Sequence, residues 1–402
     1  MQRHVVSGAN LIRPESLPFA IWGEPLVDEA SKQQMHNAMR LPITVAGVLM
    51  PDAHVGYGVP IGGVIATEGA VIPYAVGVDI ACRMRLSVFD APPALLQQQR
   101  DRLARILREH TRFGAGAEWK PVQSDAVMDD PDWEALPLLR ALKDKAARQL
   151  GTSGSGNHFV EFGELEVVQP GDGFPPGRHL ALLSHSGSRG VGYQIAEHYS
   201  RVARAQHPEL TGELAHLAWL DIGSAAGQEY WLAMNLAGKY AAANHQVIHR
   251  RIARACGLQV ITTVENHHNF AWLETLPDGR QVYVHRKGAT PAHRGALGVI
   301  PGSMGDPGFV VRGRGSPHAL NSASHGAGRR LSRNQSFRQL SARERDAYLR
   351  ERGVVLLGGG LDESPQAYKN IHAVMEAQAD LVEIVARFYP RLVMMTDDPR
   401  DI

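Results

Sequence analysis

The sequence is poor in several features that define large classes of protein. Its 402 residues include only two cysteines, Cys82 and Cys256, which excludes a framework of several disulfides. Its longest apolar stretches, such as residues 43–50, are too short to span a bilayer, and no charged-then-apolar signal pattern opens the chain. Acidic and basic residues nearly cancel, to a net charge of +1, so no global field attracts nucleic acid. These absences predict a soluble, cytoplasmic protein whose basic surfaces are local.

Apolar periodicity and turn residues outline one α+β domain over residues 1–402, because no Pro- or Ser-rich linker divides the chain. Short strands are predicted within residues 41–90, and a hairpin-like pair at 159–168 and 179–184. Helices are predicted at 94–112, 138–150, 193–205, 225–256 (with a break at Gly238), 342–350 and 365–388. Residues 259–264 and 280–286 are β-like, and 288–333 mix loop and strand. Residues 113–137 are typical of a loop or mobile flap.

Glycine-rich, helix-poor stretches hold candidate metal ligands of three chemical kinds. Asp79 and Cys82 form a D-x-x-C pattern just after a predicted strand. A bound divalent cation deprotonates a thiol, and the resulting thiolate is a strong ligand that can bridge two ions. The alternative is a buried structural cysteine beside a turn aspartate, and spacing alone does not choose between them. Cys256, at a helix end without polar neighbours, is predicted to be structural.

A second candidate ligand, His158, follows the turn G-T-S-G-S-G-N. The N–H groups of such a turn, and its tolerance of positive φ, suit phosphates or a ligand close to the main chain. Glu161 shares a strand face with Phe159, so it could accept hydrogen bonds from the edge of a nucleobase; the alternative is a surface charge. His185 heads S-H-S-G-S-R-G after an apolar strand, and we expect it at the opposite end of the hairpin-like pair from His158.

Two further motifs add an arginine and a histidine pair. Arg189 in S-H-S-G-S-R-G offers a bidentate contact to phosphate. His267 and His268 precede Asn269, which can hydrogen-bond an imidazole that binds a metal. Spacing does not decide which histidine of the pair is the ligand. The histidines on predicted helices are interpreted as surface or satisfied core residues: His110, His198, His245 and His249.

Residues 307–343 form a basic segment with seven arginines and no acidic residue. Such a charge run is usually a solvated face. Here the intervening Gly and Ser, and His325 between a serine and a glycine, favour an anion site. Upstream, HRKGAT supplies Arg286 and Lys287, and IPGSMG supplies another Gly-Ser turn. Because this segment holds only two aromatic residues, we expect phosphate contacts rather than base stacking to dominate.

Nine segments taken together resemble the RtcB family of GTP-dependent RNA-splicing ligases. They are MPDAHVGYGVPIGG, VGVDIAC, GTSGSGNHFVE, HSGSRG, HHN, HRKGAT, IPGSMG, SASHGAGR and DESPQAYK, in the family's order, and they cover roughly residues 50–396. The resemblance implies a single RtcB-like domain of mixed β-sheets, with surrounding helices around a central metal cleft.

The resemblance also implies a reaction. RNA ending in a 3′-phosphate or 2′,3′-cyclic phosphate is joined to RNA with a 5′-hydroxyl, in RNA repair or tRNA splicing, with two Mn²⁺ ions and GTP as cofactors. His325 matches the nucleophile that attacks the α-phosphate of GTP and becomes histidine–GMP. GMP would pass to the RNA 3′-phosphate, and the 5′-hydroxyl would displace it. The implied metal ligands are Asp79, Cys82, His158, His185 and His268, with Cys82 bridging both ions.

Further matching positions form two groups. The nucleotide-binding group is Asn157, Glu161, Ser303, Gly326, Ala327, Gly328 and Tyr368, of which Glu161 and Tyr368 lie on the guanine side. The group that contacts RNA or phosphate is Arg189, Lys287, Arg329 and Arg333.

Three positions depart from the family pattern. Met395 stands where the family has a lysine that contacts guanine, Gly308 where it has a serine near the GTP phosphates, and Arg83 where a glycine follows the metal cysteine. The loss of hydrogen-bonding partners predicts weaker guanine discrimination. Two alternative functions are a metal-dependent cyclic phosphodiesterase or phosphatase, and a protein that holds RNA ends without sealing them. His325 within HGAGR favours ligation, because hydrolysis needs no guanylylated histidine.

Overall fold

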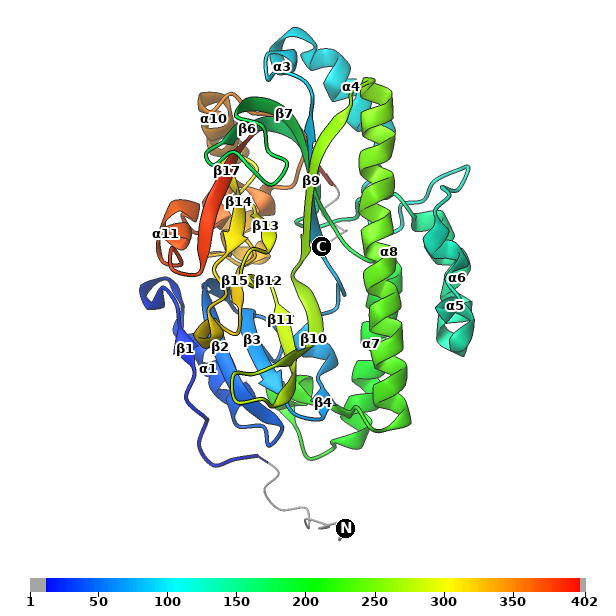
Figure 1. The fold of residues 1–402 in the computed structure, drawn as a ribbon, viewed down its shortest axis with the longest axis vertical. Coiled ribbons are helices and arrows are strands. Elements are labelled where there is room, and N and C mark those ends of the chain that lie inside the picture. Colours follow the sequence, from blue (N-terminus) through cyan, green and yellow to red (C-terminus); the bar gives the residue numbers. More distant parts are fainter. Residues whose placement is uncertain (1–11, 398–402) are drawn as a thin grey trace.

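Two large β-sheets organise residues 12–397, the part of the chain that the computed structural model describes (Figure 1). The first has the strand order β1-β2-β3-β11-β10, with bounds Ala20–Ile21, Thr44–His54, Ile61–Thr67, Gln281–Lys287 and Asn269–Thr275. The second has the order β13-β14-β17-β6-β7-β5-β9, with bounds Leu297–Ile300, Gly308–Gly313, Val382–Met395, Phe159–Val167, Gly177–Ser186, Arg83–Phe89 and Val260–His267. β16 (Val355–Gly358) pairs with β17. Smaller sheets pair β12 (Ala289–Pro291) with β15 (Ser322–Ser324), and β4 (Ala70–Val71) with β8 (Leu220–Asp221).

The two large sheets are linked by β9 and β10, which follow each other almost without interruption (Figure 1). β9 ends at His267 in the second sheet and β10 begins at Asn269 in the first, so His268 lies where the chain passes from one sheet to the other. Cys82 directly precedes β5, the neighbour of both β9 and β7. Residues that are distant in sequence therefore meet at the junction of the sheets.

Helices cover the outside of these sheets (Figure 1). Their bounds are α1 (Glu29–Met39), α2 (Pro73–Val76), α3 (Leu95–Gln98), α4 (Arg100–His110), α5 (Asp132–Ala135), α6 (Pro137–Gln149), α7 (Arg189–Gln206), α8 (Ala225–Cys256), α9 (Arg333–Gln339), α10 (Ala342–Glu351) and α11 (Ile371–Glu376). The predicted α+β class is confirmed. Among the described residues, no helix combines the length and apolar character needed to cross a bilayer.

Two of the predicted helices differ from the structure. The break predicted at Gly238 is absent from α8: a Cβ there would lie 3.1 Å from the Phe270 ring, so this glycine permits close packing instead. The helix predicted at 365–388 is wrong. The range holds only two short helices, a 3-10 turn at Pro365–Ala367 and α11, and its last residues belong to β17, because residues 382–395 hydrogen-bond to β14 and β6 on either side. Apolar residues in VEIVARF fit both periods, and sheet pairing decided between them.

Two other expectations concern the hairpin and the loop. β6 and β7 do form the predicted hairpin, but they are antiparallel with Phe159 opposite His185. His158 and His185 therefore lie side by side at its open end, and not at opposite ends as predicted. Residues 113–137 are mainly loop with two short helical turns, and the Trp133 side chain within them is fully buried. Closure of this segment over a substrate stays a prediction.

Candidate active site

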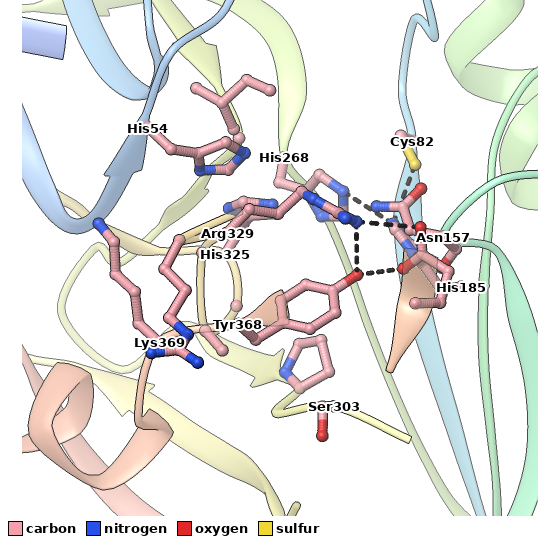
Figure 2. A pocket seen from close by; sticks show the side chains of 18 of the residues that line it. His54, Cys82, Asn157, His185, His268, Ser303, His325, Arg329, Tyr368 and Lys369 are labelled. Carbon is pink, nitrogen blue, oxygen red and sulfur yellow. Dashed lines mark hydrogen bonds and ion pairs between the residues drawn. The ribbon is translucent and has the colours of Figure 1, made fainter. Parts of the chain in front are cut away.

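A cavity of about 910 Å³ lies at the junction of the two large sheets. Figure 2 shows Cys82 and His185 on one side of it, Lys369 on the other, and His325 and Arg329 between them. The cavity is lined by most of the site residues predicted from the sequence: Asp79, Cys82, Asn157, Glu161, His185, His268, Lys287, Ser303, His325, Gly326, Ala327, Gly328, Arg329, Arg333 and Tyr368. His158 and Arg189 do not line the cavity, and both side chains are buried.

The five predicted metal ligands form one cluster around the Cys82 sulfur. Cys82 Sγ lies 3.0 Å from His185 Nε2 and 3.4 Å from His158 Nε2. His185 Nε2 lies 3.1 Å from His268 Nε2, and His158 Nε2 lies 2.9 Å from Asp79 Oδ2. Cys82 is therefore common to two groups, one with His185 and His268 and the other with His158 and Asp79. Of the histidine pair, His268 contacts this cluster, whereas His267 stacks on Trp272.

The protonation of these side chains fits a bound cation. Nδ1 of His158 lies 3.0 Å from the Ser153 carbonyl oxygen, and Nδ1 of His185 lies 3.0 Å from the Asn157 carbonyl oxygen. Both rings therefore donate from Nδ1 and direct Nε2 into the cluster. Burial lowers the pKa of His185 to about 3. Burial and the nearby Asp79 raise the pKa of the Cys82 thiol well above its usual value, so a thiolate there requires a cation beside it. Imidazole rings converging on one sulfur are typical of a transition-metal site.

Two glycines allow the ligand loops to close around this cluster. A Cβ at Gly187 would lie 2.3 Å from Asp79 Oδ1, and one at Gly154, where φ is +99°, would lie 2.1 Å from Arg189 Nη1. Larger residues at either position would displace the carboxylate or the guanidinium. The loops that contain Gly154 and Gly187 can therefore pack this closely against Arg189 and Asp79 only because these two residues are glycines.

Asn244, which the sequence did not single out, ties the two ligand loops to α8. This fully buried side chain accepts a hydrogen bond from Gly151 N at 2.7 Å. Its amide donates to the Thr152 carbonyl at 3.0 Å and to Ser186 Oγ at 3.2 Å. The loop before His158 and the strand end that carries His185 are thus held by one side chain.

We predict that Asn244→Ala weakens binding of a divalent transition metal by about 10–100-fold, because loss of a residue that orients metal ligands typically has this effect. Unpaired buried groups should also reduce the free energy of unfolding by about 1–3 kcal/mol. Calorimetric titration with Mn²⁺ and thermal unfolding of the metal-free protein measure the two effects separately. The control is Asn235→Ala, whose amide donates only to the Trp231 carbonyl one turn earlier on α8. Equal Mn²⁺ affinity in both variants would contradict the assignment.

His325 lies beside the cluster, with its ring centroid 5.0 Å from that of His268. Its Nδ1 is 2.6 Å from Asp52 Oδ2, which also accepts from the backbone N–H of His325 at 3.0 Å and of Gly326 at 3.3 Å. Burial would raise the pKa of Asp52, but the His325 ring holds it below its usual value. Asp52 is therefore an ionised carboxylate that fixes Nδ1 and leaves Nε2 of His325 available.

Arg329 and Arg333 of the basic segment are paired with acids from elsewhere in the chain. Arg329 Nη1 lies 3.1 Å from Glu363 Oε1, and Arg333 Nη1 lies 2.7 Å from the same oxygen and also contacts Asp362. The Tyr368 hydroxyl contacts Glu363, and the Arg329 guanidinium lies 5.2 Å from the Tyr368 ring centroid. Asp362 and Glu363 hold the two guanidinium groups at the cavity wall and partly neutralise the positive charge of the basic segment.

One wall of the cavity is apolar apart from a carboxyl group. Val393 and Met395 on β17 pair with Glu161 and Phe159 on β6, and all four line the cavity. Burial raises the pKa of Glu161 well above its usual value. Glu161 is thus not the surface charge considered as an alternative. Ser303, in the connection between β13 and β14, donates a hydrogen bond to Asp306 at 2.5 Å.

The remaining basic and histidine candidates separate into cavity and core. Lys287 lines the cavity, and burial lowers its pKa to about 7. Arg286, one residue earlier, is fully buried and paired with Glu274 at 2.6 Å, so it is structural. His245 and His249 on α8 are buried core residues that hydrogen-bond to Ser184 Oγ at 2.7 and 2.8 Å.

Sequence reasoning gave no role to several residues that the structure places in or behind the site. Asp52 lies in MPDAH, and Asp362 and Glu363 lie in DESPQ, so their segments were noticed but their contacts were not. Asn244 lies within a long helix and carried no signal. Contacts across the sheet junction identify these residues, and spacing along the chain does not.

The fold and the cluster define a class of protein with a buried cysteine, histidine and aspartate site beside a carboxylate-oriented histidine. The model of the family described as "tRNA-splicing ligase RtcB" matches residues 34–136 and 134–396. The chain is 33% identical over 407 residues to RNA-splicing ligase RtcB1 of Escherichia coli, covering 93% of this chain and 96% of that protein. It is 34% identical to RNA-splicing ligase RtcB of Mycobacterium tuberculosis, covering 89% and 98%, and 31% identical to tRNA-splicing ligase RtcB of Nanoarchaeum equitans, covering 94% and 95%. The chain belongs to the RtcB family of ligases.

Proposed function

We propose that this protein is a GTP- and Mn²⁺-dependent RNA ligase that joins 3′-phosphate or 2′,3′-cyclic phosphate ends to 5′-hydroxyl ends. The observation that carries the proposal is His325, held by Asp52 with its ring 5.0 Å from the His268 ring, in the cavity that also holds Arg329 and Lys287. A nucleophilic histidine next to metal ligands and cations suits nucleotidyl transfer.

The residues that would hold two Mn²⁺ ions follow from the two groups around Cys82. His185 and His268 would bind one ion, His158 and Asp79 the other, and the Cys82 thiolate both. When bound, paired ions neutralise phosphate oxygens and stabilise entering and leaving oxygens. The Nδ1 hydrogen bonds of His158 and His185 keep their Nε2 atoms directed at this position.

The nucleophile would be Nε2 of His325, because Nδ1 is bound to Asp52. Attack on the α-phosphorus of GTP forms an N–P bond and releases pyrophosphate. An oxygen of the RNA 3′-phosphate then attacks that phosphorus, which frees the imidazole and leaves an RNA-ppG end. The 5′-hydroxyl oxygen attacks the RNA 3′-phosphorus and expels GMP. A cyclic phosphate is first opened by hydrolysis.

The other cavity residues would bind nucleotide and RNA. Gly326, Ala327 and Gly328 follow the nucleophile closely and suit the nucleotide phosphates, as do Asn157 and Ser303. Glu161 and Tyr368 would face guanine. Arg329, Arg333 and Lys287 would contact phosphates. Arg189, buried beside His158, would contact RNA phosphate next to the ligand cluster. The cytoplasmic location and the single domain stay predictions.

The test is a ligation assay with GTP and Mn²⁺, in which an RNA ending in a 3′-phosphate, or in a parallel reaction in a 2′,3′-cyclic phosphate, is mixed with an RNA that has a 5′-hydroxyl. We expect a sealed product that requires GTP and is absent with His325→Ala. If cyclic phosphate is hydrolysed but nothing is sealed, the phosphodiesterase alternative holds instead. If RNA is bound without any change, the protein holds ends without sealing them.

Lys287 should make RNA binding depend on pH. Its pKa is about 7 in the free protein because burial disfavours the ammonium form, and a phosphate contact would favour that form again. Affinity for 3′-phosphate RNA should be constant below pH 7 and fall by about tenfold per unit above it, since one proton must be taken up. Fluorescence anisotropy in metal-free buffer measures this. Lys287→Arg, always charged, should show a flat profile; the same slope in both proteins would rule out Lys287.

Met395 should reduce selectivity for guanine. It lines the cavity next to Glu161 but offers no hydrogen bond where the family has a lysine. GTP should still be preferred over ATP in labelling of the protein, and Met395→Lys should widen that preference by about tenfold, as expected for a hydrogen bond to a charged group. An unchanged ratio of labelling rates would show that this position does not read the base.

A further inference from the structure

An exposed aromatic group lies at the edge of the cavity, on the loop between β2 and β3. Tyr57 is 68% exposed, and the neighbouring Val55 is 53% exposed. Both line the cavity, as does Val78, which is 41% exposed and directly precedes the candidate ligand Asp79. A cluster of exposed apolar side chains at the edge of a cavity marks a binding surface more often than scattered ones do.

The Tyr57 ring packs against a second aromatic layer. Its centroid lies 5.4 Å from that of His216 in the short helix Gly212–Leu217, and the His216 ring lies 4.7 Å from that of Tyr74 on α2. We name Tyr57, His216 and Tyr74 the aromatic shelf. The His216 and Tyr74 rings pack behind the Tyr57 ring on one side, and the Tyr57 ring is exposed to solvent on the other.

The backbone under the Tyr57 ring is fixed on both sides. Gln34 Nε2 donates to the Gly56 carbonyl at 2.6 Å, and Gly56 N donates to Gln34 Oε1 at 3.0 Å. Gly58 has φ +71°, and a Cβ there would lie 2.9 Å from the His216 carbonyl oxygen. The exposure of the tyrosine ring is therefore set by an ordered loop. Such preorganisation lowers the entropy cost of binding a flat partner.

Cations connect the shelf to the metal ligands. Lys287 Nζ donates to the Tyr57 carbonyl at 2.5 Å, and the N–H of the next residue, Gly288, donates to the His268 carbonyl at 2.8 Å. The Arg204 guanidinium lies 5.9 Å from the Tyr74 ring centroid. A polyanionic strand with its reacting end at the ligand cluster would meet Lys287 first and the shelf next.

We propose that the aromatic shelf stacks an unpaired nucleobase of the RNA strand whose end lies at the ligand cluster. This inference rests on the proposed function, and it names the part of the RNA that the site would hold. An exposed ring with flanking cations suits single-stranded nucleic acid, because every base has a flat face and every linkage a negative charge. The sequence predicts that phosphate contacts dominate over stacking, because the basic segment holds only two aromatic residues; this loop, distant in sequence, supplies another.

The experiment measures binding of short single-stranded RNA with a 3′-phosphate or a 5′-hydroxyl end by fluorescence anisotropy. Tyr57→Ala should weaken binding by about tenfold, and Tyr57→Phe should bind like the parent because the ring remains. The control is Tyr193→Ala, a 50% exposed tyrosine on α7 outside the cavity lining, which should bind like the parent. Thermal unfolding of each variant checks that the fold is kept.

Oligonucleotides with single abasic positions then locate the stacked base. An abasic position near one end should cost the parent about tenfold in affinity and cost Tyr57→Ala almost nothing. Parental affinity in Tyr57→Ala, or an equal abasic effect in both proteins, would overturn the shelf. Ligation by the parent is measured in parallel. If the parent seals RNA while Tyr57→Ala binds normally, only the shelf fails; if the parent seals nothing, the proposed function fails, whatever Tyr57 does.

Discussion

Replacing Cys82 with alanine should abolish both metal binding and guanylylation while the protein stays folded. The sulfur is the shared atom of the cluster, 3.0 Å from His185 Nε2 and 3.4 Å from His158 Nε2, so its loss removes a ligand from both groups at once. Four ligands divided between two positions then leave only two for each ion. Elemental analysis of protein equilibrated with Mn²⁺, and labelling with α-labelled GTP, measure the two losses.

The chain offers a matched control in its other cysteine. Cys256 is also buried, at the end of α8 and among apolar residues, so Cys256→Ala should retain metal and label. The thermal midpoint of the metal-free Cys82→Ala protein should be close to that of the metal-free parent, because the thiol is not needed for packing of the sheets. If metal content and labelling both survived in Cys82→Ala, the bridging role would be excluded.

The second large effect is expected for Asp52→Asn. Asp52 Oδ2 accepts hydrogen bonds from His325 Nδ1 and from two backbone N–H groups, which fixes the imidazole with Nε2 free. An amide can present its NH₂ group to Nδ1 and stabilise the wrong tautomer, and it lacks the charge that stabilises an imidazolium. Comparable changes to a carboxylate behind a catalytic histidine cost up to roughly 10⁴-fold in rate, so we expect a loss of at least about a hundredfold.

The measurement is the rate of His325 labelling at saturating GTP and Mn²⁺, compared with metal content. Asp52 contacts His325 and not the five ligands, so metal content should stay at the parental level while the rate falls. A variant that lost metal and rate together would indicate that Asp52 acts through the fold. Parental labelling by Asp52→Asn would show that the carboxylate does not position the nucleophile.

Local sequence patterns predicted much of the fold. The hairpin at 159–184 and α6 ended by Gly151 follow from periodicity and turn residues, and α8 follows from its apolar stripe. The failure at 365–388 has a physical cause. VEIVARF contains β-branched and apolar residues at spacings that fit a helix or a strand, and β17 became a strand because β14 and β6 pair with both of its edges. Such long-range pairing is not visible in a window of sequence.

The candidate site was predictable where chemistry is carried by rare residue types in glycine-rich loops. Cys82 and His185 stood out in this way, and the structure brings them within 3.0 Å. The supporting contacts were not predictable. Asp52 is 273 residues from His325, and Asn244 is 92 residues from Thr152, so only the folded chain shows that they touch. Arg329 and Arg333 were predicted to contact RNA or phosphate, but the acids that pair with them in DESPQ come from a separate segment, so these ion pairs were not predictable.

The most direct measurement is to incubate the protein with α-labelled GTP and Mn²⁺ and to map any covalent label to a peptide. We expect an acid-labile label on the peptide that contains His325, lost in His325→Ala and reversed by adding pyrophosphate. A label that persists in His325→Ala, or none with any nucleotide despite bound Mn²⁺, would contradict a guanylyl-transfer site built on this histidine.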